Sequence, residues 1–317
     1  MTRAVVFAYH NVGARCLELL LRYGVDVSLV VTHLDNPDET IWFDRVADIA
    51  AARGLAVATP PDPNAPDMLA RIRVLAPEFL FSFYYRQMLR PELLAIPSRG
   101  ALNMHGSLLP KYRGRVPVNW AVLHGERETG ATLHYMVEKP DAGDIVAQTA
   151  VTILPDDTAG EVFAKVTTAA AETLEHALPG LLAGTAPRVA QDLAQGAYFG
   201  GRKPEDGRID WSRPARAIHD LVRAVAPPFP GAFTPLGSAE LRVLRTRVVD
   251  ESSPPGTAVL RIDQDRMFVD CGGGGRLEIL AAELDGRLCD AHVLAARLGG
   301  SFLLPLAAPL EDARRPG

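Results

Sequence analysis

The stretch AVVFAYHNVGARCLELLLRYGVDVSLVVTH, residues 4–33, indicates a strand, a helix and a second strand in immediate succession. Its two ends, 4–10 and 25–33, are apolar and β-branched runs of the kind that form buried strands. Between them, apolar residues recur at helical spacing up to Gly24, which is a natural helix stop. A strand, a crossover helix and a neighbouring strand make one unit of a parallel sheet.

The same alternation continues along the first half of the chain. Helical spacing predicts helices over 43–54 and 66–77, and short apolar runs predict strands over 55–61 and 78–85. A further strand ends at His105. Strands that alternate with helices predict an α/β fold, with an open and mostly parallel sheet that carries helices on both faces. A long amphipathic segment, 161–183, is expected to be its closing helix.

From about residue 239 the pattern changes to short strands separated by turn residues. This pattern predicts a small antiparallel β-barrel. Its expected strands are 240–249, 256–262, 266–271 and 276–284. The CGGGG run at 271–275 is interpreted as a hairpin turn, because no helix follows it to supply a phosphate-binding N-terminus.

The two patterns together predict two domains. We expect residues 1–200 to form the sheet domain, 205–305 the barrel domain and 306–317 a flexible tail. The segment 194–211, rich in glycine and charge, is expected to be the linker between the domains.

Composition narrows the class of protein. The 317 residues carry 33 cations, 38 anions and a net charge of −5, which argues against a nucleic acid as the main partner. The 3 cysteines have no CxxC spacing, as expected for a reduced, cytoplasmic protein without a zinc site. The N-terminal residues are expected to form neither a signal peptide nor a membrane span. The first turn after the opening strand also lacks GxGxxG, so a dinucleotide site is not expected.

The stretch ALNMHGSLLPKYRG, residues 101–114, carries the candidate chemistry. In a strand, Asn103 and His105 point to the same face and Met104 points to the other. They lie at the carboxyl end of their strand, where open parallel sheets bind ligands. The pair alone leaves a purely structural role equally open.

Two further features favour a functional role. The loop after His105 supplies the cations Lys111, Arg113 and Arg115, although solvated charges are the usual alternative. Downstream, EKPDAGDIV (138–146) lies between two strand-like runs and contains Asp141. An aspartate in a loop usually forms a turn. Near a histidine, however, a carboxylate fixes the ring tautomer and favours the protonated form.

These motifs resemble the folate-dependent formyltransferases, in which an Asn–x–His–x–SLLP core is followed by an aspartate. The similarity is greater to the formyltransferase domain of the bifunctional enzymes of polymyxin resistance, which formylate UDP-4-amino-4-deoxy-L-arabinose, and it covers almost the whole chain. It implies a Rossmann-like domain followed by an OB-like barrel, here as a stand-alone enzyme of lipid A biosynthesis. The similar stretches are VVFAYHNVG, THLDNP, FSFYYR, HGSLLPKYRGRVPVNW, ETGATLHYMV, DAGDIVAQ and VRAVAPPFPGAF.

The resemblance implies Asn103, His105 and Asp141 as catalytic residues. An amine attacks the formyl carbon of 10-formyltetrahydrofolate and forms a tetrahedral oxyanion. Asn103 would donate a hydrogen bond to that oxygen. His105 would move a proton from the attacking ammonium toward the leaving folate nitrogen, and Asp141 would hold its ring. No metal is expected. His134 is a rival histidine, ranked second because no asparagine precedes it at the same spacing.

The resemblance also implies two binding regions. Folate would be bound largely by backbone atoms of Gln87, Met88 and Leu89 and of the loop Val137, Glu138, Lys139, Pro140 and Asp141. For Met88 and Leu89, core packing is the alternative. Arg115 is the main candidate for contact with the sugar nucleotide, with a surface ion pair as its alternative. Further candidates for that contact are Tyr9, Asn36, Arg86 and Tyr112, and His10 and His33 are expected to line the same cleft.

Three functions are compared on this basis: a sugar-nucleotide N-formyltransferase, a methionyl-tRNA formyltransferase and a non-catalytic folate- or nucleotide-binding module. The acidic balance and the FAYHN and FYYR stretches favour the first over the second. Intact Asn103, His105 and Asp141 argue against the third. Other UDP- or dTDP-linked amino sugars remain open as acceptors.

Overall fold

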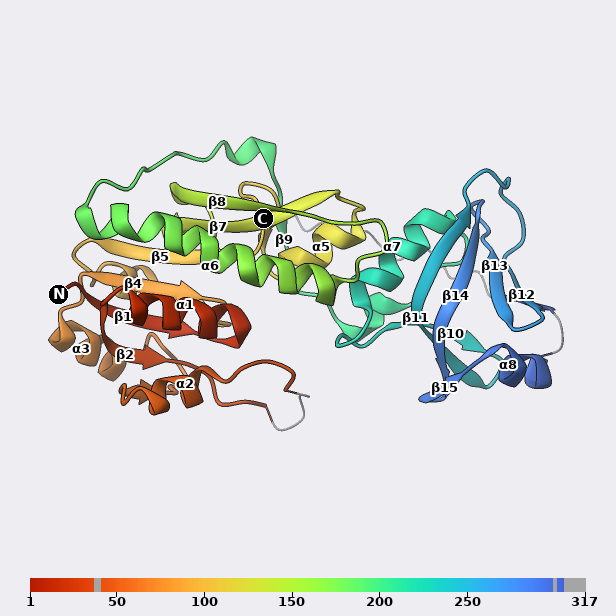
Figure 1. Ribbon diagram of the computed structural model, residues 1–317, viewed down its shortest axis with the longest axis horizontal. Coiled ribbons are helices and arrows are strands. Elements are labelled where there is room, and N and C mark those ends of the chain that lie inside the picture. The colour runs from red at the N-terminus through yellow and green to blue at the C-terminus, as the bar shows by residue number, and fades with distance from the viewer. Residues whose placement is uncertain (37–40, 299–300, 305–317) are drawn as a thin grey trace. The chain divides into compact units, whose positions relative to one another are not determined.

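The computed structural model describes residues 1–36, 41–298 and 301–304. The chain forms two compact units (Figure 1). The first comprises 1–117, 129–151 and 164–198, and the second comprises 118–128, 152–163 and the chain from 199 onward. Within the described ranges, no helix is both long and apolar enough to cross a membrane.

The first unit is built on a sheet of seven strands among the described residues, in the order β3-β2-β1-β4-β5-β7-β8. The five strands from β3 to β5 are parallel, as expected from the alternation of strands and helices. The strands are β1 (Arg3–Ala8), β2 (Asp26–Val31), β3 (Val57–Ala58), β4 (Phe79–Phe83), β5 (Gly100–His105), β7 (Glu128–Tyr135) and β8 (Ile145–Thr152).

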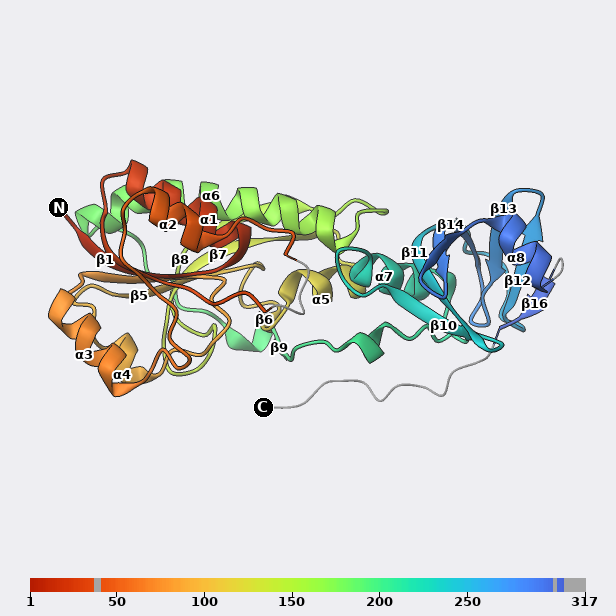
Figure 2. The same cartoon turned by 90° about the horizontal axis from the view of Figure 1, so that it is seen from below.

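Helices cover both faces of this sheet, which confirms the predicted α/β class (Figure 2). On one face, α3 and α4 pack Met68, Ile72 and Leu93 against the apolar side chains of the central strands. On the other face lie α1, α2 and α6. The helices of this part of the chain are α1 (His10–Arg22), α2 (Val46–Ala52), α3 (Pro66–Leu75), α4 (Pro91–Leu94), α5 (Pro117–Leu123) and α6 (Ala159–Ala183).

The strand β7 runs antiparallel to β5, and its register fixes which residues face each other. Asn103 lies opposite His134, and His105 lies opposite Thr132. Residues opposite each other on such strands have their side chains on the same face of the sheet. The pairing therefore brings a second histidine to the predicted site.

Several non-glycine residues with a left-handed backbone follow the strands of this sheet. Such conformations cost about 1–3 kcal/mol each and cluster at functional sites. They are His10 (φ 64°), Tyr84 (φ 57°), Tyr112 (φ 56°), Val116 (φ 47°) and Asp141 (φ 52°).

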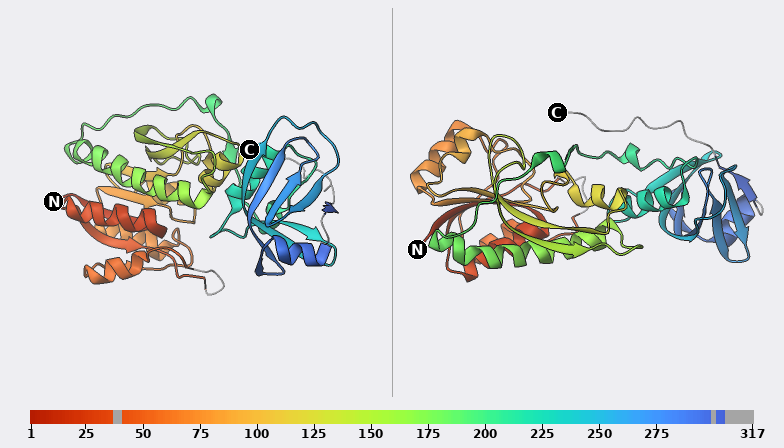
Figure 3. Two further views of the ribbon diagram at one scale, coloured as in Figure 1. Left: turned by 45° about the vertical axis from the view of Figure 1, so that its right-hand side comes forward. Right: turned by 90° about the horizontal axis from the view of Figure 1, so that it is seen from above.

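The second unit contains the antiparallel sheet predicted from the second half of the chain (Figure 3). Its strand order is β10-β11-β14-β13-β12-β16, with β15 beside β14. Leu241, Val243 and Leu277 lie in its core, together with Trp211 and Ile218. The strands are β10 (Ala232–Leu236), β11 (Ala239–Asp250), β12 (Val259–Asp263), β13 (Arg266–Asp270), β14 (Arg276–Leu284), β15 (Arg287–Cys289) and β16 (Ser301–Leu303).

This unit also contains two helices that the strand pattern does not predict, α7 (Ala215–Val225) and α8 (Ala291–Leu298). The glycine run is the hairpin turn between β13 and β14, as predicted, and it packs against the start of α7. The carbonyl of Gly274 accepts a hydrogen bond from Ala215 N, and a Cβ on Gly273 would lie 2.4 Å from Pro214 N. The glycines therefore serve close backbone packing.

The segment expected to be a linker contains local structure. It carries two short 3-10 helices, Leu193–Gln195 and Pro204–Gly207, and the strand β9 (Tyr198–Phe199), which pairs with β6 (Arg113–Gly114). Arg113 N donates to the carbonyl of Ala197 at 3.1 Å, so this part of the segment is tied to the loop that follows β5. The expected tail, 306–317, lies outside the described residues.

Candidate active site

Asn103 and His105 lie on β5, which ends at His105. The His105 side chain is buried, with 6% of it exposed, and Asn103 is half-buried. Met104 is packed in the core. The alternation expected of a strand is therefore present, and it places the two polar side chains together at the carboxyl end of β5.

The two ring nitrogens of His105 have different partners. Nε2 lies 2.8 Å from the carbonyl oxygen of Tyr112. A carbonyl oxygen only accepts hydrogen bonds, so Nε2 carries a hydrogen and donates it. Nδ1 lies 3.6 Å from Asp141 Oδ1. A second proton on this ring would therefore be held at Nδ1, facing a carboxylate.

Asp141 is the acidic centre of the group. Its Oδ2 accepts a hydrogen bond from Gly114 N at 2.8 Å, and its Oδ1 lies 3.5 Å from His134 Nε2. Burial by itself would raise the pKa of Asp141. The charge of His105, the hydrogen bond and charge of His134 and the Gly114 N–H outweigh burial and lower this pKa well below its usual range. Asp141 is therefore a carboxylate at neutral pH.

His134 belongs to the same cluster. Its Nδ1 lies 2.9 Å from the carbonyl oxygen of Tyr135, so Nδ1 carries a hydrogen. Its Nε2 lies 3.2 Å from Asn103 Nδ2 and, in the neutral ring, accepts from that amide. Sequence analysis ranked His134 second because no asparagine precedes it at the same spacing, and spacing along the chain does not show which distant strands pair. The missing signal is the antiparallel register of β7 against β5.

The loop that carries Asp141 is fixed by a residue that sequence reasoning missed. Gln191 Nε2 donates to the carbonyl of Asp141 at 3.0 Å and to that of Gly143 at 2.6 Å. Gly143 is required there, because a Cβ would lie 2.0 Å from the carbonyl oxygen of Tyr135. The loop therefore returns closely against β7 and holds Asp141 between the two histidines.

The residues expected to bind folate differ in exposure. Met88 is 60% exposed and Leu89 is 5% exposed, so packing in the core accounts for Leu89 alone. Gln87 is exposed, and its Nε2 donates to the carbonyl of Pro61. Asn64 Nδ2 donates to the carbonyl of Met88 at 2.9 Å, while its Oδ1 accepts from Arg90 N at 2.7 Å. The backbone of the segment after β4 is thus held by the side chain of Asn64, and the segment presents an exposed apolar side chain.

The second expected folate segment, Val137 to Asp141, follows β7. Val137 is 47% exposed. Glu138 and Lys139 are exposed, and Pro140 is half-buried. Most of this segment is therefore accessible to a ligand, while Asp141 at its end belongs to the buried cluster.

The residues expected to contact the substrate also separate into two groups. Arg115, Arg86 and Asn36 are exposed. Tyr9 and Tyr112 are buried, and the contact of Tyr112 with His105 is made by its backbone carbonyl.

Aromatic and histidine rings gather after β1, β2 and β4. His33 stacks on Tyr85 with ring centroids 4.1 Å apart, and Arg86 lies 4.6 Å above the ring of Tyr9. The hydroxyl of Tyr9 donates to Asp35 Oδ1 at 2.9 Å. Burial, together with the charge of Arg86, lowers the pKa of His33 to about 4. His33 is therefore neutral at physiological pH, and its Nε2 accepts from Arg86 N at 3.0 Å.

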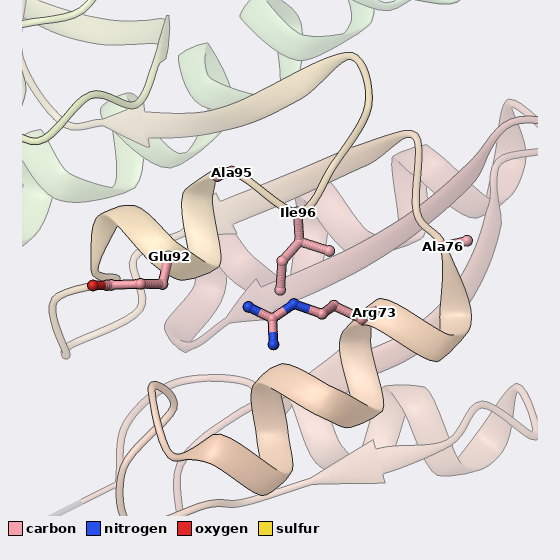
Figure 4. Close-up of a pocket in the computed structure, with 5 residues that line it drawn as sticks. All are labelled: Arg73, Ala76, Glu92, Ala95 and Ile96. Atoms are coloured by element: carbon pink, nitrogen blue, oxygen red, sulfur yellow. The ribbon is translucent and has the colours of Figure 1, made fainter.

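An open surface pocket lies elsewhere on this unit, between α3 and α4 (Figure 4). Arg73 and Ala76 come just before β4, and Ile96 comes just before β5. This pocket is at the edge where these parallel strands begin, so it is distinct from the cluster at their carboxyl ends. No group of three or more His, Cys, Asp or Glu side chains within the described ranges is arranged to hold a metal ion.

Two family models match this chain. The formyl transferase model matches residues 13–178, and the model of the formyl transferase C-terminal domain matches 202–298. The chain belongs to the formyl transferase family. This formyltransferase is therefore a transferase enzyme, and the cluster around Asp141 lies within the part of the chain that the first model matches.

Three solved structures have the same fold. An N-formyltransferase from Helicobacter canadensis, in complex with folinic acid and dTDP-3-aminofucose, is 17% identical with a TM-score of 0.70, over 88% of this chain and 99% of that one. WlaRD, a sugar 3N-formyl transferase, is 16% identical with a TM-score of 0.69, over 88% and 97%. A sugar N-formyltransferase from a Shewanella species is 19% identical with a TM-score of 0.60, over 77% and 96%.

Proposed function

We propose that this formyltransferase transfers the formyl group of 10-formyltetrahydrofolate to the amino group of a sugar nucleotide. The observation that carries the proposal is the convergence of His105 and His134 on one oxygen of Asp141, with the Asn103 amide bonded to His134. An amide donor beside two rings that can hold protons suits a reaction that forms an oxyanion and moves a proton. The names of the first two similar structures, which include a folate and a dTDP compound, support these substrate classes.

In the proposed reaction, the amine nitrogen forms a bond to the formyl carbon, and the bond between that carbon and the folate nitrogen breaks. The attacking amine loses a proton and the leaving nitrogen gains one, so no oxidant or reductant is needed. Asn103 donates a hydrogen bond to the oxyanion. His105 holds the transferred proton at Nδ1, the ring nitrogen that faces Asp141.

We place the folate beside Met88 and the loop from Val137. The exposed side chains of Met88 and Val137 give an apolar rim to these segments. A flat heterocycle bound there would cover apolar surface that the free protein exposes to water. Backbone N–H and carbonyl groups of the same segments can bind its polar edge.

We propose UDP-4-amino-4-deoxy-L-arabinose as the acceptor, which would place the enzyme in lipid A modification and polymyxin resistance. A dTDP-linked amino sugar is the second candidate, favoured by the dTDP compounds in the names of two similar structures. Arg115, exposed in the loop after β5, is the cation that we expect to pair with the diphosphate. The cysteines of the chain, Cys16, Cys271 and Cys289, are free, which supports a cytoplasmic location.

A formylation assay tests this function. The enzyme is incubated with 10-formyltetrahydrofolate and a panel of UDP- and dTDP-linked amino sugars, and the N-formyl product is measured by mass spectrometry. We expect formylation of at least one amino sugar, with UDP-4-amino-4-deoxy-L-arabinose turned over most efficiently. The absence of formylation across the panel would contradict the proposal, and a preference for a dTDP sugar would change the acceptor.

Initiator methionyl-tRNA is the control substrate. It distinguishes the proposed sugar-nucleotide formyltransferase from a methionyl-tRNA formyltransferase, whose substrate is a polyanion. With 33 cations against 38 anions, we expect weak tRNA binding that is lost at physiological salt. Salt-resistant binding of that tRNA, with formylation of its methionine, would overturn the sugar proposal.

A further inference from the structure

The hydroxyl of Thr132 is at the centre of a buried hydrogen-bond network. Thr132 lies on β7 opposite His105 and is fully buried. Its Oγ1 donates to the carbonyl of Ser107 at 2.6 Å and accepts from Leu109 N at 3.1 Å and from Gln148 Nε2 at 2.9 Å. A hydroxyl has one hydrogen and two lone pairs, so all of its hydrogen-bonding capacity is used.

Gln148, on β8, adds a second contact to the same loop. Its Nε2 also donates to the carbonyl of Leu109 at 2.9 Å. Thr132 and Gln148 together bind the backbone of the loop at two residues, through the carbonyl of Ser107 and through the N–H and carbonyl of Leu109. The exposed Gln148 and the buried Thr132 therefore fix this loop from two strands that come later in the sequence.

The loop held in this way determines the hydrogen bond of His105. Inside the loop, Ser107 Oγ donates to the carbonyl of Lys111 at 2.6 Å. The next residue, Tyr112, supplies the carbonyl that accepts from His105 Nε2. Hydrogen bonds and the covalent backbone of the loop thus connect Thr132 to the ring of the proposed catalytic histidine.

We propose that Thr132 and Gln148 are positioning residues, which act on catalysis through His105. By fixing the loop, they keep the carbonyl of Tyr112 in place, so that Nε2 of His105 retains its hydrogen and Nδ1 faces Asp141. The expected effect of this positioning on activity rests on the proposed formyl transfer. The expected effect on the tautomer of His105 does not, because the hydrogen bond to Tyr112 is present whatever the substrate is.

The test compares Thr132→Val, Thr132→Ser and Gln148→Met with wild type. Valine keeps the shape of threonine but leaves Ser107 O and Leu109 N without their buried partner, whereas serine keeps the hydroxyl. The matched control is Thr173→Val, because Thr173 is equally buried and donates to Thr149 Oγ1 at 2.7 Å, away from the loop. Two measurements are made: the tautomer of His105 by nitrogen-15 NMR of the imidazole, and kcat and KM for formyl transfer.

We expect Thr132→Val to lower kcat by about 10- to 100-fold with little change in KM, because a misplaced reacting group costs rate more than binding. The Nδ1–H tautomer of His105 should increase in the same variant. Thr132→Ser should restore both values, Gln148→Met should show a smaller change in the same direction, and Thr173→Val should match wild type.

An unchanged tautomer and kcat in Thr132→Val would overturn the proposal, and so would an equal loss in Thr173→Val or a failure of serine to restore them. If Thr132→Val does not fold, the exposed Gln148→Met decides by the same two measurements. If wild type formylates no acceptor, the proposed function fails, while the tautomer in these variants still decides the positioning role.

Discussion

The Nδ2 atom of Asn103 lies 3.2 Å from Nε2 of His134, across the antiparallel strands β5 and β7. Because His134 Nδ1 donates to a backbone carbonyl, Nε2 of the neutral ring has a lone pair that accepts an N–H of Asn103, whereas in the charged ring Nε2 donates to Asp141. This contact determines which way the amide faces. The second N–H of the amide then remains to donate to an oxyanion.

Asn103→Ala should lower kcat by about 10²–10³-fold with little change in KM for folate, since its hydrogen bond strengthens only in the transition state. His134→Phe should lower kcat by about tenfold or more, because the amide loses the partner that orients it. The double variant should be no slower than Asn103→Ala, because His134 acts through Asn103. Steady-state kinetics of the three variants measures this coupling.

Met104→Leu is the control for these variants. Met104 points away from the site and is 1% exposed, and this substitution conserves volume, so turnover should be nearly unchanged. Independent losses from Asn103→Ala and His134→Phe, multiplying in the double variant, would contradict the orienting role. Near-normal turnover of folded Asn103→Ala and His105→Ala would remove the catalytic assignment.

Asp141→Asn should lower kcat by at least about 10²-fold. The amide can still accept from Gly114 N, so the loop should keep its fold, but the negative charge beside both histidines is lost. Without that charge, a proton held at Nδ1 of the histidine no longer faces a carboxylate, and the acidic limb of the rate–pH profile should shift downward. Kinetics across about pH 5–9, around the ordinary histidine pKa of about 6.5, measures both effects.

Asp144→Asn is the matched control, three residues further along the same loop, and should leave the profile unchanged. A profile of Asp141→Asn that coincides with wild type would show that Asp141 does not act on the titrating group.

The stability of the fold gives an independent measurement of the Asp141 charge. The pKa of Asp141 lies below its unfolded value of 3.8, so its contribution to folding is present above that pH and is lost as the pH falls below it.

His33 should make the fold sensitive to mild acid. Its pKa is about 4 in the folded protein and 6.5 when unperturbed, so between these values the unfolded chain binds more protons. The free energy of unfolding should therefore decrease as the pH falls from 6.5 toward 4. His33→Gln, which can still accept from Arg86 N, should flatten this dependence. Urea unfolding of both proteins at several pH values measures it, and parallel curves would contradict the assignment.

Met88→Ser should raise KM for the folate by about tenfold and leave stability almost unchanged. Met88 is 60% exposed in the free protein, and burying a methionine side chain is worth about 1.5–3 kcal/mol. Val74→Ser, at an 85% exposed position on α3, is the control for loss of exposed apolar surface. An unchanged KM for Met88→Ser would place the folate elsewhere.

Limited proteolysis with a nonspecific protease should cut the segment 194–211 near residues 200–203 rather than at 194–198. The earlier part is bonded to the loop after β5, through Arg113 N and the carbonyl of Ala197. The resulting N-terminal fragment should keep its α/β circular dichroism. Preferred cleavage at 194–198, or a fragment without that signal, would contradict the proposed domain division.

Sequence periodicity was sufficient for the succession of strands and helices along the first half of the chain and for the shared face of Asn103 and His105, because both depend on neighbours in the chain. It was not sufficient for His134, Thr132 or Gln191. These residues reach the site through strand pairing and loop contacts, which are non-local and leave no local pattern. The helix α7 was missed although Ile218, Val222 and Val225 recur at helical spacing and are buried.

The left-handed backbone at His10, Tyr84, Tyr112, Val116 and Asp141 has a consequence for engineering. A design method that scores only folding would replace several of these residues with glycine, because glycine adopts this conformation without steric cost. At Asp141 that choice would remove the carboxylate, and at Tyr112 it would loosen the carbonyl that holds His105. Variants selected for heat resistance should therefore lose turnover first at these turns, where this enzyme has exchanged folding free energy for the placement of its reactive groups.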